Sequence, residues 1–339
     1  MKKVIDIVVP WVDGNDPIWQ EDKKKFADDS DGDKRIIRYR DWEMLPYWFR
    51  GVEKYLPWVR KIHFITYGHL PEWLNIKNPK LNIVNHRDYI PDKYLPTFSA
   101  NPIELNMFRI EDLSEQFIYA NDDMFFVKEM KPEDFFESGL PKDCALEAIH
   151  QFRKGGIDHM VANDLEIINA NFNKREVMKK NLKKWYCLKY KKALLKNIYL
   201  APCGNFVGFE NQHLPQAFLK STFKEIWEKE YDILDKTSAN KFRTVLDVNQ
   251  WLMRYWQFAS GKFLPGTIDK GKFFAIGKDD EKIREAITEQ KYKMICLSDD
   301  DEHLNFDEEK EKICNSNRRD YFLVSNACDI CKYNCGFNI

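Results

Sequence analysis

Residues 5–19 read IDIVVPWVDGNDPIW, a run of β-branched apolar residues that stops abruptly in a polar turn. The apolar run from Ile5 to Val9 predicts a short buried strand. Asp13, Gly14 and Asp16 follow it within a few positions. Because Asp, Asn, Gly and Pro suit tight turns, these carboxylates have a purely structural explanation. They become candidates for ligand binding only if the strand ends where other polar residues gather.

Strand-like and helix-like segments alternate through the first half of the chain. Strand patterns occur at residues 5–9, 61–68, 81–84 and 117–122, and helical spacing of apolar residues occurs at 42–55 and 103–113. Such alternation predicts an α/β fold with a mostly parallel sheet covered on both faces by helices. In these sheets, ligands bind at the carboxyl ends of the strands. We therefore expect Asp13, after the first strand, and Asp122, after the fourth, to share one rim.

The second half of the chain is expected to add helices and one late strand. Residues 150–200 are rich in lysine and predict a helical insertion, with one helix from 174 to 195. The remaining patterns are helical at 215–229 and 244–258 and strand-like at 293–297. We expect residues 1–315 to form a single catalytic α/β domain and residues 316–339 to form a cysteine-containing tail.

Composition narrows the class of protein. The chain has 339 residues, of which 44% are hydrophobic, and this is enough to bury a large core. Its 53 basic and 54 acidic residues give a formal net charge of −1, so no overall field favours nucleic acid as a partner. No apolar run reaches the roughly 20 residues that span a bilayer. The N-terminus lacks a small-residue cleavage site, and eight cysteines without a secretion signal favour reduced thiols in the cytoplasm.

A few polar residues could carry chemistry. Asp122 and Asp123 follow the fourth strand, where paired carboxylates suit a hard divalent cation and an Asx turn is the structural alternative. His213 lies in a loop before a predicted helix, where a histidine can act as a general base, although most lone histidines do not. Arg243 and Asp247 lie four apart, and a surface ion pair at a helix start is the simpler explanation for them.

Four cysteines near the C-terminus form a second candidate site. They are Cys314, Cys328, Cys331 and Cys335. Cys-x-x-Cys is a usual zinc-chelating unit. The irregular spacing and the polar surroundings leave free surface thiols as the alternative.

Residues 179–192, KKNLKKWYCLKYKK, combine seven lysines with apolar and aromatic residues. The latter are Leu182, Trp185, Tyr186, Leu188 and Tyr190. A basic amphipathic segment can lie on anionic lipid with its aromatic rings at the interface. The alternative is a solvated lysine face whose apolar residues pack into the core.

Four blocks of sequence carry a family resemblance. The first block is IDIVVPWVDGNDPIW. The second covers residues 38–127 and runs from RYRDWEMLPYWFRG through LPTFSANPIELNMFRI to LSEQFIYANDDMFF. The third covers residues 213–252 and begins HLPQAFLKSTFKEIW, and the fourth is MICLSDDDEH. In content and order they resemble the Stealth family of hexose-1-phosphate transferases, which includes bacterial capsule phosphotransferases and GlcNAc-1-phosphotransferase. Three segments depart from the family pattern. Trp42-Glu43-Met44 stand where the family has Asn-Gly-Glu, and Ser99-Ala100-Asn101-Pro102 stand where it often has Asn-Ser-Asn-Ala. Leu297-Ser298-Asp299 stand where it usually has Leu-Asn-Asp.

The resemblance implies a Rossmann-like fold of the nucleotide-sugar transferase type and assigns roles to individual residues. The implied ligands of a magnesium or manganese ion are Asp122, Asp123 and Asp299. The implied catalytic residues are His213 as the base, Arg243 as stabiliser of the phosphoryl oxygens, and Asp247 as the residue that orients one of them. The residues expected to contact the donor are Asp13, Gly14, Arg40, Asp41, Arg50, Asn101 and Glu104.

The implied reaction transfers a sugar 1-phosphate from a UDP-hexose or UDP-N-acetylhexosamine to an acceptor sugar hydroxyl. It releases UMP, forms a phosphodiester and serves capsule or cell-surface polysaccharide synthesis. The acceptor would be a lipid-linked or polymeric glycan at the cytoplasmic face of the membrane. Two alternatives remain open: a metal-dependent glycosyltransferase that releases UDP, and a carbohydrate-binding assembly factor without activity. The complete set of paired aspartates, histidine and arginine argues against the second.

Overall fold

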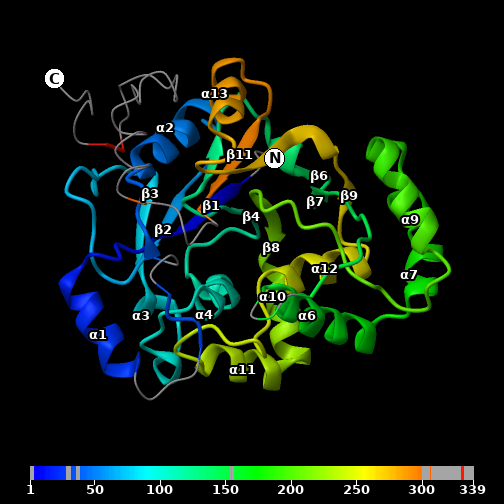
Figure 1. The fold of residues 1–339 in the computed structure, drawn as a ribbon, viewed down its shortest axis with the longest axis horizontal. Coiled ribbons are helices and arrows are strands. Elements are labelled where there is room, and N and C mark those ends of the chain that lie inside the picture. The colour runs from blue at the N-terminus through cyan, green and yellow to red at the C-terminus, as the bar shows by residue number, and fades with distance from the viewer. Residues whose placement is uncertain are drawn as a thin grey trace.

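The fold is built on one central five-stranded sheet of order β3-β2-β1-β4-β8 (Figure 1). The computed structural model describes residues 4–27, 32–35, 39–152, 154, 156–299, 306 and 330–331. The strands are β1 (Ile5–Pro10), β2 (Ile62–Thr66), β3 (Leu81–Asn85), β4 (Gln116–Tyr119) and β8 (Gln216–Leu219). The first four are parallel, and β8 pairs with β4 in the antiparallel direction. The predicted α/β fold with a mostly parallel sheet is confirmed.

β1 lies in the middle of this sheet and is buried on both faces. Ile7 belongs to a hydrophobic core that contains Trp48 of helix α2 (Leu45–Tyr55). Val8 belongs to a different core, which contains Phe223 of helix α10 (Lys220–Lys229). Because both faces of the strand are covered, its sequence is continuously apolar rather than alternating. The opening stretch of the chain is therefore the centre of the fold.

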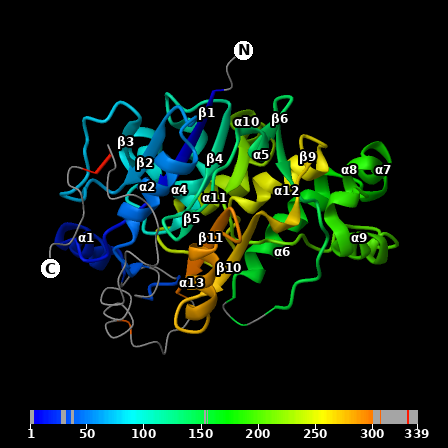
Figure 2. The ribbon, with the colours of Figure 1, turned by 90° about the horizontal axis from the view of Figure 1, so that it is seen from above.

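A second sheet, of order β10-β11-β5, continues from the end of β4 (Figure 2). Its strands are β5 (Met124–Phe126), β10 (Gly271–Ala275) and β11 (Met294–Ser298). β11 runs antiparallel to β5, with Cys296 opposite Met124. Residues 120–123 alone connect β4 to β5, so Asp122 and Asp123 lie at the junction of the two sheets.

Shorter elements complete the main body. They are α1 (Pro17–Ala27), α3 (His86–Tyr89), α4 (Ala100–Leu105), α5 (Pro132–Phe135), β6 (Phe136–Glu137), β7 (Leu140–Asp143), α11 (Tyr231–Ala239), α12 (Trp251–Ala259), β9 (Leu264–Pro265) and α13 (Asp280–Thr288). Strands β6, β7 and β9 form a small third sheet. Ser99 caps α4 by accepting a hydrogen bond from the backbone N–H of Asn101.

The lysine-rich insertion is helical, as predicted, but the single helix expected at 174–195 is wrong. The helices are α6 (Asp158–Asn171), α7 (Lys174–Lys180), α8 (Leu182–Trp185) and α9 (Leu194–Leu200), with a 3₁₀ segment at Leu188–Ala193. Trp185 and Tyr190 are both fully buried. Residues five apart point to different sides of a straight helix, and the break between α8 and the 3₁₀ segment lets both side chains face the core. In Figure 1, α7 and α9 lie at the far right of the molecule, away from β1 and β2.

Three other helix boundaries differ from the sequence prediction. The segment 215–229 begins as strand β8, because Gln216 to Leu219 pair with β4, and becomes helical only at Lys220. The segment 244–258 becomes helical only at Trp251, since Asp247 folds the preceding residues into a turn. The helix expected at 103–113 starts earlier, at Ala100, and ends at Leu105, before a 3₁₀ turn.

Two residues of the cysteine-containing tail are described. Cys331 is buried and forms a β-bridge with Leu74, and the backbone N–H of Asn75 donates to the Ile330 carbonyl at 2.7 Å. Cys331 is therefore not a surface thiol. The other three tail cysteines, Cys314, Cys328 and Cys335, lie outside the described residues. None of the helices in the described part of the chain has the length and apolar character needed to cross a membrane.

Candidate active site

The topology brings three segments to one edge of the central sheet. β1 and β4 are parallel neighbours, with Val8 opposite Tyr119, so the residues that follow them emerge on the same side. β8 is antiparallel to β4, with Gln216 opposite Tyr119, so the residues that precede β8 reach the same edge. Asp13, Asp123 and His213 are carried by these three segments. The strand directions therefore bring the three segments to the same edge of the sheet.

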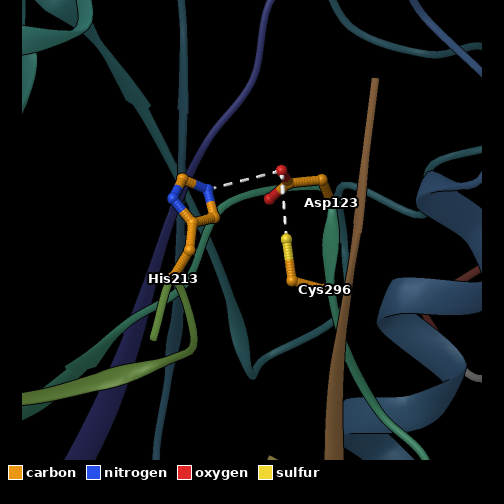
Figure 3. A group of neighbouring side chains, drawn as sticks. All are labelled: Asp123, His213 and Cys296. Atoms are coloured by element: carbon orange, nitrogen blue, oxygen red, sulfur yellow. Dashed lines mark hydrogen bonds and ion pairs between the residues drawn. The ribbon is translucent and has the colours of Figure 1, made fainter. Parts of the chain in front are cut away.

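Asp123 is the point where the site converges (Figure 3). Its Oδ2 lies 3.5 Å from Nε2 of His213 and 3.5 Å from Sγ of Cys296. Its backbone carbonyl accepts a hydrogen bond from the N–H of Leu297 at 2.9 Å, which fixes the junction to β11. Sequence reasoning did not identify Cys296, because only the antiparallel pairing of β11 with β5 brings it beside Asp123.

His213 lies in the loop before strand β8. The prediction that it precedes a helix is therefore wrong. Its φ of +46° is in the left-handed region, which a side chain other than glycine adopts only when the surroundings impose it. Arg254 of α12 anchors the preceding residues: Nη1 donates to the Glu210 carbonyl at 3.0 Å and to Oδ1 of Asn211 at 2.9 Å. The same guanidinium forms a two-pronged ion pair with Asp143 at 2.7 and 2.9 Å. The backbone that presents the imidazole is therefore fixed.

Carboxyl groups crowd together around Asp122. Its side chain is accessible to solvent but crowded by protein, and desolvation followed by the carboxylates of Asp123 and Asp41 raises its pKa to about 8. Oδ1 of Asp123 is buried and has no hydrogen-bond partner among the described residues. Crowded carboxylates with an unsatisfied oxygen fit a hard divalent cation, which takes oxygen ligands. Asp122 and Asp123 are the residues that would hold it.

Asp299, expected as a third metal ligand, lies with Arg40. Nη1 of Arg40 is 3.3 Å from its Oδ2, and both side chains are mostly buried. Asp299 follows β11 by one residue, two positions after the residue that binds the Asp123 carbonyl. The structure thus brings Arg40, Asp41 and Asp299 to the same edge, with Asp299 already neutralised by an arginine.

Beneath this edge lies a buried layer from α4. The Tyr119 hydroxyl is in hydrogen-bond contact with the Glu104 carboxyl and with Oδ1 of Asn121. Burial raises the pKa of Glu104, and the Tyr119 hydrogen bond and the charges of Arg243 and His213 oppose that shift. Glu104 therefore lies within electrostatic reach of both expected catalytic residues. Its burial places it behind them, not in contact with solvent.

Asp247 is fully buried and organises the loop that carries Arg243. It accepts hydrogen bonds from Nδ2 of Asn101 at 2.9 Å and from Nδ2 of Asn240 at 2.7 Å. It also accepts the N–H and the hydroxyl of Thr244, at 2.9 and 2.7 Å. The bond from Asn101 ties the loop to α4, and the bonds from Thr244 hold the residue that follows Arg243.

The turn that follows β1 is stabilised by hydrogen bonds between its own aspartates and nearby backbone N–H groups. Oδ1 of Asp13 accepts the N–H of Asn15 at 2.8 Å, and Oδ1 of Asp16 accepts the N–H of Trp19 at 2.7 Å and caps α1. A side chain on Gly14 would collide with the backbone of Tyr39. The absence of a side chain at Gly14 is therefore explained by packing within the protein.

Arg50 stands out among the expected donor contacts. It is 2% exposed on α2, and its Nε and Nη2 have no hydrogen-bond partner among the described residues. A buried guanidinium whose N–H donors have no acceptor destabilises the folded protein. A phosphate or carboxylate group is the best acceptor for these donors. The side chain thus has the properties of an anion-binding residue.

Comparisons with known proteins identify the family of this chain. Family models match at residues 3–31 (Stealth protein CR1, conserved region 1) and 38–143 (Stealth protein CR2, conserved region 2). The capsular polysaccharide phosphotransferase WcwK of Streptococcus pneumoniae is 44% identical, over 91% of this chain and 92% of the relative. The receptor polysaccharide phosphotransferase WefC of Streptococcus oralis is 42% identical, over 87% of this chain and 90% of the relative. A solved structure of galactosyltransferase LgtC with donor and acceptor sugar analogues overlaps loosely, with a TM-score of 0.38 at 8% identity, covering 91% of this chain and 95% of that one. The chain therefore belongs to the Stealth family, and it is a transferase enzyme.

Proposed function

We propose that this enzyme transfers a sugar 1-phosphate from a UDP-sugar to a hydroxyl group of a glycan acceptor, releases UMP and leaves a phosphodiester. The observation that carries the proposal is the approach of His213 to Asp123 at the carboxyl edge of β1 and β4, where α/β sheets bind ligands. The identity of more than 40% to named polysaccharide phosphotransferases supports phosphorus, rather than the anomeric carbon, as the atom attacked.

In the proposed step, Nε2 of His213 accepts the proton of the acceptor hydroxyl as its oxygen attacks the phosphorus next to the sugar. The bond between that phosphorus and the bridging oxygen breaks, and UMP leaves with the electron pair. Asp123, 3.5 Å from Nε2, stabilises the imidazolium that forms. In-line positioning and charge neutralisation provide most of the catalysis in phosphoryl transfer, so a fixed histidine loop is an advantage.

The cationic residues fit the remaining roles. Arg243, supported by Asp247 and Asn101, would stabilise the equatorial phosphoryl oxygens. Arg50 would bind a donor phosphate through the nitrogens that have no partner in the described part of the chain. When the donor binds, Arg40 would release Asp299 and contact the donor instead.

The donor set at the sheet junction supports a magnesium or manganese ion. Asp122 and Asp123 would hold it, with Asp299 as a further ligand once it is released from Arg40. When bound, such an ion supplies neutralisation of the pyrophosphate charge. Glu104, Asp13 and Asp41 are proposed to line the donor site around these residues.

The test of this proposal is identification of the spent nucleotide. The enzyme is incubated with a panel of UDP-hexoses and UDP-N-acetylhexosamines, with a glycan acceptor and magnesium, and the nucleotides are separated by chromatography. We expect UMP, formed in proportion to a phosphodiester product detected by mass spectrometry. UDP as the sole product would assign a glycosyltransferase reaction instead.

We further propose that the enzyme works at the cytoplasmic face of a membrane on a lipid-linked or polymeric acceptor of capsule or cell-surface polysaccharide. Trp185 and Tyr190, expected at the lipid interface, are buried in the core. Other apolar side chains of the insertion are exposed: Leu182, Leu188, Leu195, Ile198 and Tyr199. Exposed lysines accompany them: Lys179, Lys180, Lys183, Lys189 and Lys192. This combination of apolar and basic groups supports docking on anionic lipid. We expect the protein to co-sediment with anionic liposomes but not with neutral ones. Equal recovery with both would exclude docking on anionic lipid.

A further inference from the structure

Three different kinds of donor atom meet at the centre of the site (Figure 3). Oδ2 of Asp123, Nε2 of His213 and Sγ of Cys296 all lie within 4.8 Å of one another. They come from the β4–β5 junction, the loop before β8 and strand β11, so the fold assembles them from distant parts of the chain. The oxygen, nitrogen and sulfur atoms are close enough for one metal ion to bind all three.

This donor set differs from the one that magnesium prefers. Magnesium binds oxygen ligands, whereas zinc binds cysteine sulfur, histidine nitrogen and carboxylate oxygen in tetrahedral sites. Zinc–ligand bonds of 2.0–2.3 Å place tetrahedral ligand atoms about 3.3–3.7 Å apart. Two of the three separations here are 3.5 Å, so little movement is needed to reach that geometry.

The depth of the three side chains also suits a cation from solvent. Cys296 is fully buried and forms the floor, whereas the side chains of Asp123 and His213 are 30% and 36% exposed. An ion can therefore enter past the carboxylate and the imidazole. Three protein ligands leave one tetrahedral position open, as in zinc sites that bind water.

We propose that Asp123, His213 and Cys296 form a site for a thiophilic divalent cation, Zn²⁺, and that occupation of this site switches the enzyme off. On binding, the Cys296 thiol releases its proton to solvent and a sulfur–zinc bond forms. The inhibitory part rests on the proposed function. A His213 Nε2 bound to zinc has no lone pair with which to accept the acceptor proton, and Asp123 is removed from the magnesium site. For mixed ligands of this kind zinc outcompetes magnesium even when magnesium is in large excess.

The binding test uses Co²⁺ as a coloured probe on the full chain. A thiolate ligand gives a sulfur-to-cobalt absorption band, which Zn²⁺ should abolish by displacement. Cys296→Ser should lose the band. Loss of even an outer-shell partner costs about 10–100-fold in metal affinity, so loss of the sulfur should weaken Zn²⁺ binding by at least that factor.

Two control variants locate the site. Cys203→Ser changes a partly exposed cysteine outside the cluster and should keep both the band and the Zn²⁺ affinity. The double variant Cys328→Ser/Cys331→Ser tests the tail thiols and should also keep them. A band that survives in Cys296→Ser, or disappears in the tail variant, overturns the proposal.

A further variant covers the case in which Cys296→Ser does not fold. His213→Ala changes a partly exposed side chain, keeps the sulfur and should weaken Zn²⁺ binding by a similar factor, with an unchanged circular dichroism spectrum. Unchanged Zn²⁺ affinity in His213→Ala overturns the proposed ligand set.

The inhibition test measures UMP release in excess Mg²⁺ while Zn²⁺ is added. Activity should fall over the Zn²⁺ range set by the measured affinity and return when Zn²⁺ is dialysed away and Mg²⁺ is restored. Full activity with Zn²⁺ bound overturns the inhibitory part. A cobalt band without UMP release from any nucleotide sugar overturns the proposed function and leaves the metal site standing.

Discussion

At the residue scale, the two central side chains are held by different means. Asp123 is fixed through its backbone, since its carbonyl accepts the Leu297 N–H, and its Oδ1 has no partner within the described residues. His213 has a left-handed backbone conformation and follows a loop that Arg254 anchors. Both residues were predicted from the sequence, because a strand end and a family block marked them. Cys296 was not, because its role depends on a pairing between distant strands.

His213→Ala should lower kcat by about 10²–10⁴-fold, the usual contribution of one well-placed acid–base group. Donor binding should be largely kept, since the base acts on the acceptor. Steady-state UMP release and donor affinity measured by calorimetry give the two quantities. His159→Ala is the matched control, because that partly buried histidine packs beside Phe152 outside the site and should keep wild-type turnover. Wild-type turnover in His213→Ala would assign the base to another residue.

Asp123→Asn should lower activity by about 10²–10³-fold, because the substitution keeps the shape and removes the charge that stabilises the imidazolium and the cation. The exposed Asp232 provides the control, and Asp232→Asn should behave as the wild type. Metal dependence is measured alongside: a chelator should abolish the activity of the wild type, and added Mg²⁺ should restore it. Full activity in excess chelator would exclude a metal at this junction.

At the element scale, the direction of one strand determines whether the site exists. The apolar pattern at 215–229 predicts a helix, but its first residues are needed as β8 on the open edge of β4. Edge pairing is a long-range requirement, so tertiary context overrides local pattern. β1 to β4 were predicted because apolar runs bounded by turn residues identify buried strands without long-range information. The antiparallel β8 then supplies His213 at the correct edge.

Arg254→Lys should lower kcat by about 10–100-fold, because displacement of a catalytic group by a fraction of an ångström has effects of this size. Lysine keeps the charge but loses the two-pronged contact with Asp143 and the contacts with Glu210 and Asn211. Donor KM should change little. The rate is measured well below the melting temperature, so that a loss of stability does not mimic the effect. The exposed Arg284 gives the control Arg284→Lys, and an equal fall in both variants would contradict a positioning role.

At the scale of the whole molecule, the proposed active site and a buried polar network lie at opposite ends of β1. The proposed catalytic groups follow its carboxyl end, whereas Asp6 lies near its amino end and is fully buried. Asp6 accepts hydrogen bonds from Arg60 at 2.8 Å, from the Ser114 N–H at 2.8 Å and from His63 at 3.1 Å. This network could not be predicted from the sequence, because the partners of Asp6 are distant along the chain and meet it only in the folded sheet.

The titration of Asp6 should make the unfolding free energy depend on pH. Burial alone would raise its pKa, but the hydrogen bonds from His63, Arg60 and Ser114 outweigh burial and lower the pKa from 3.8 to about 2. A carboxyl whose pKa is lower in the folded state stabilises the fold above its unfolded pKa, and this contribution is lost as the pH falls from about 4 to about 2. We expect Asp6→Asn to cost about 2 kcal/mol at pH 7, from the size of this shift.

Urea unfolding of both proteins between pH 7 and pH 2 measures the effect. The difference in unfolding free energy between wild type and Asp6→Asn should shrink by about the same 2 kcal/mol towards low pH. At neutral pH the folded variant should keep its phosphotransfer activity, because Asp6 is remote from the carboxyl edge. A constant difference at all pH values would show that Asp6 does not titrate with the shifted pKa.

The contacts of Arg254 have a consequence for how this enzyme can be remodelled. One guanidinium binds Asp143, before the lysine-rich insertion, and Glu210 and Asn211, after it. The insertion between them is part of the core, because α6 packs against α12 and Trp185 packs against Phe258. Its exposed side chains, such as Leu188 and Tyr199, can be exchanged without disturbing these contacts. New acceptors or membranes can therefore be matched by resurfacing the insertion, while its buried face and the Arg254 contacts are kept.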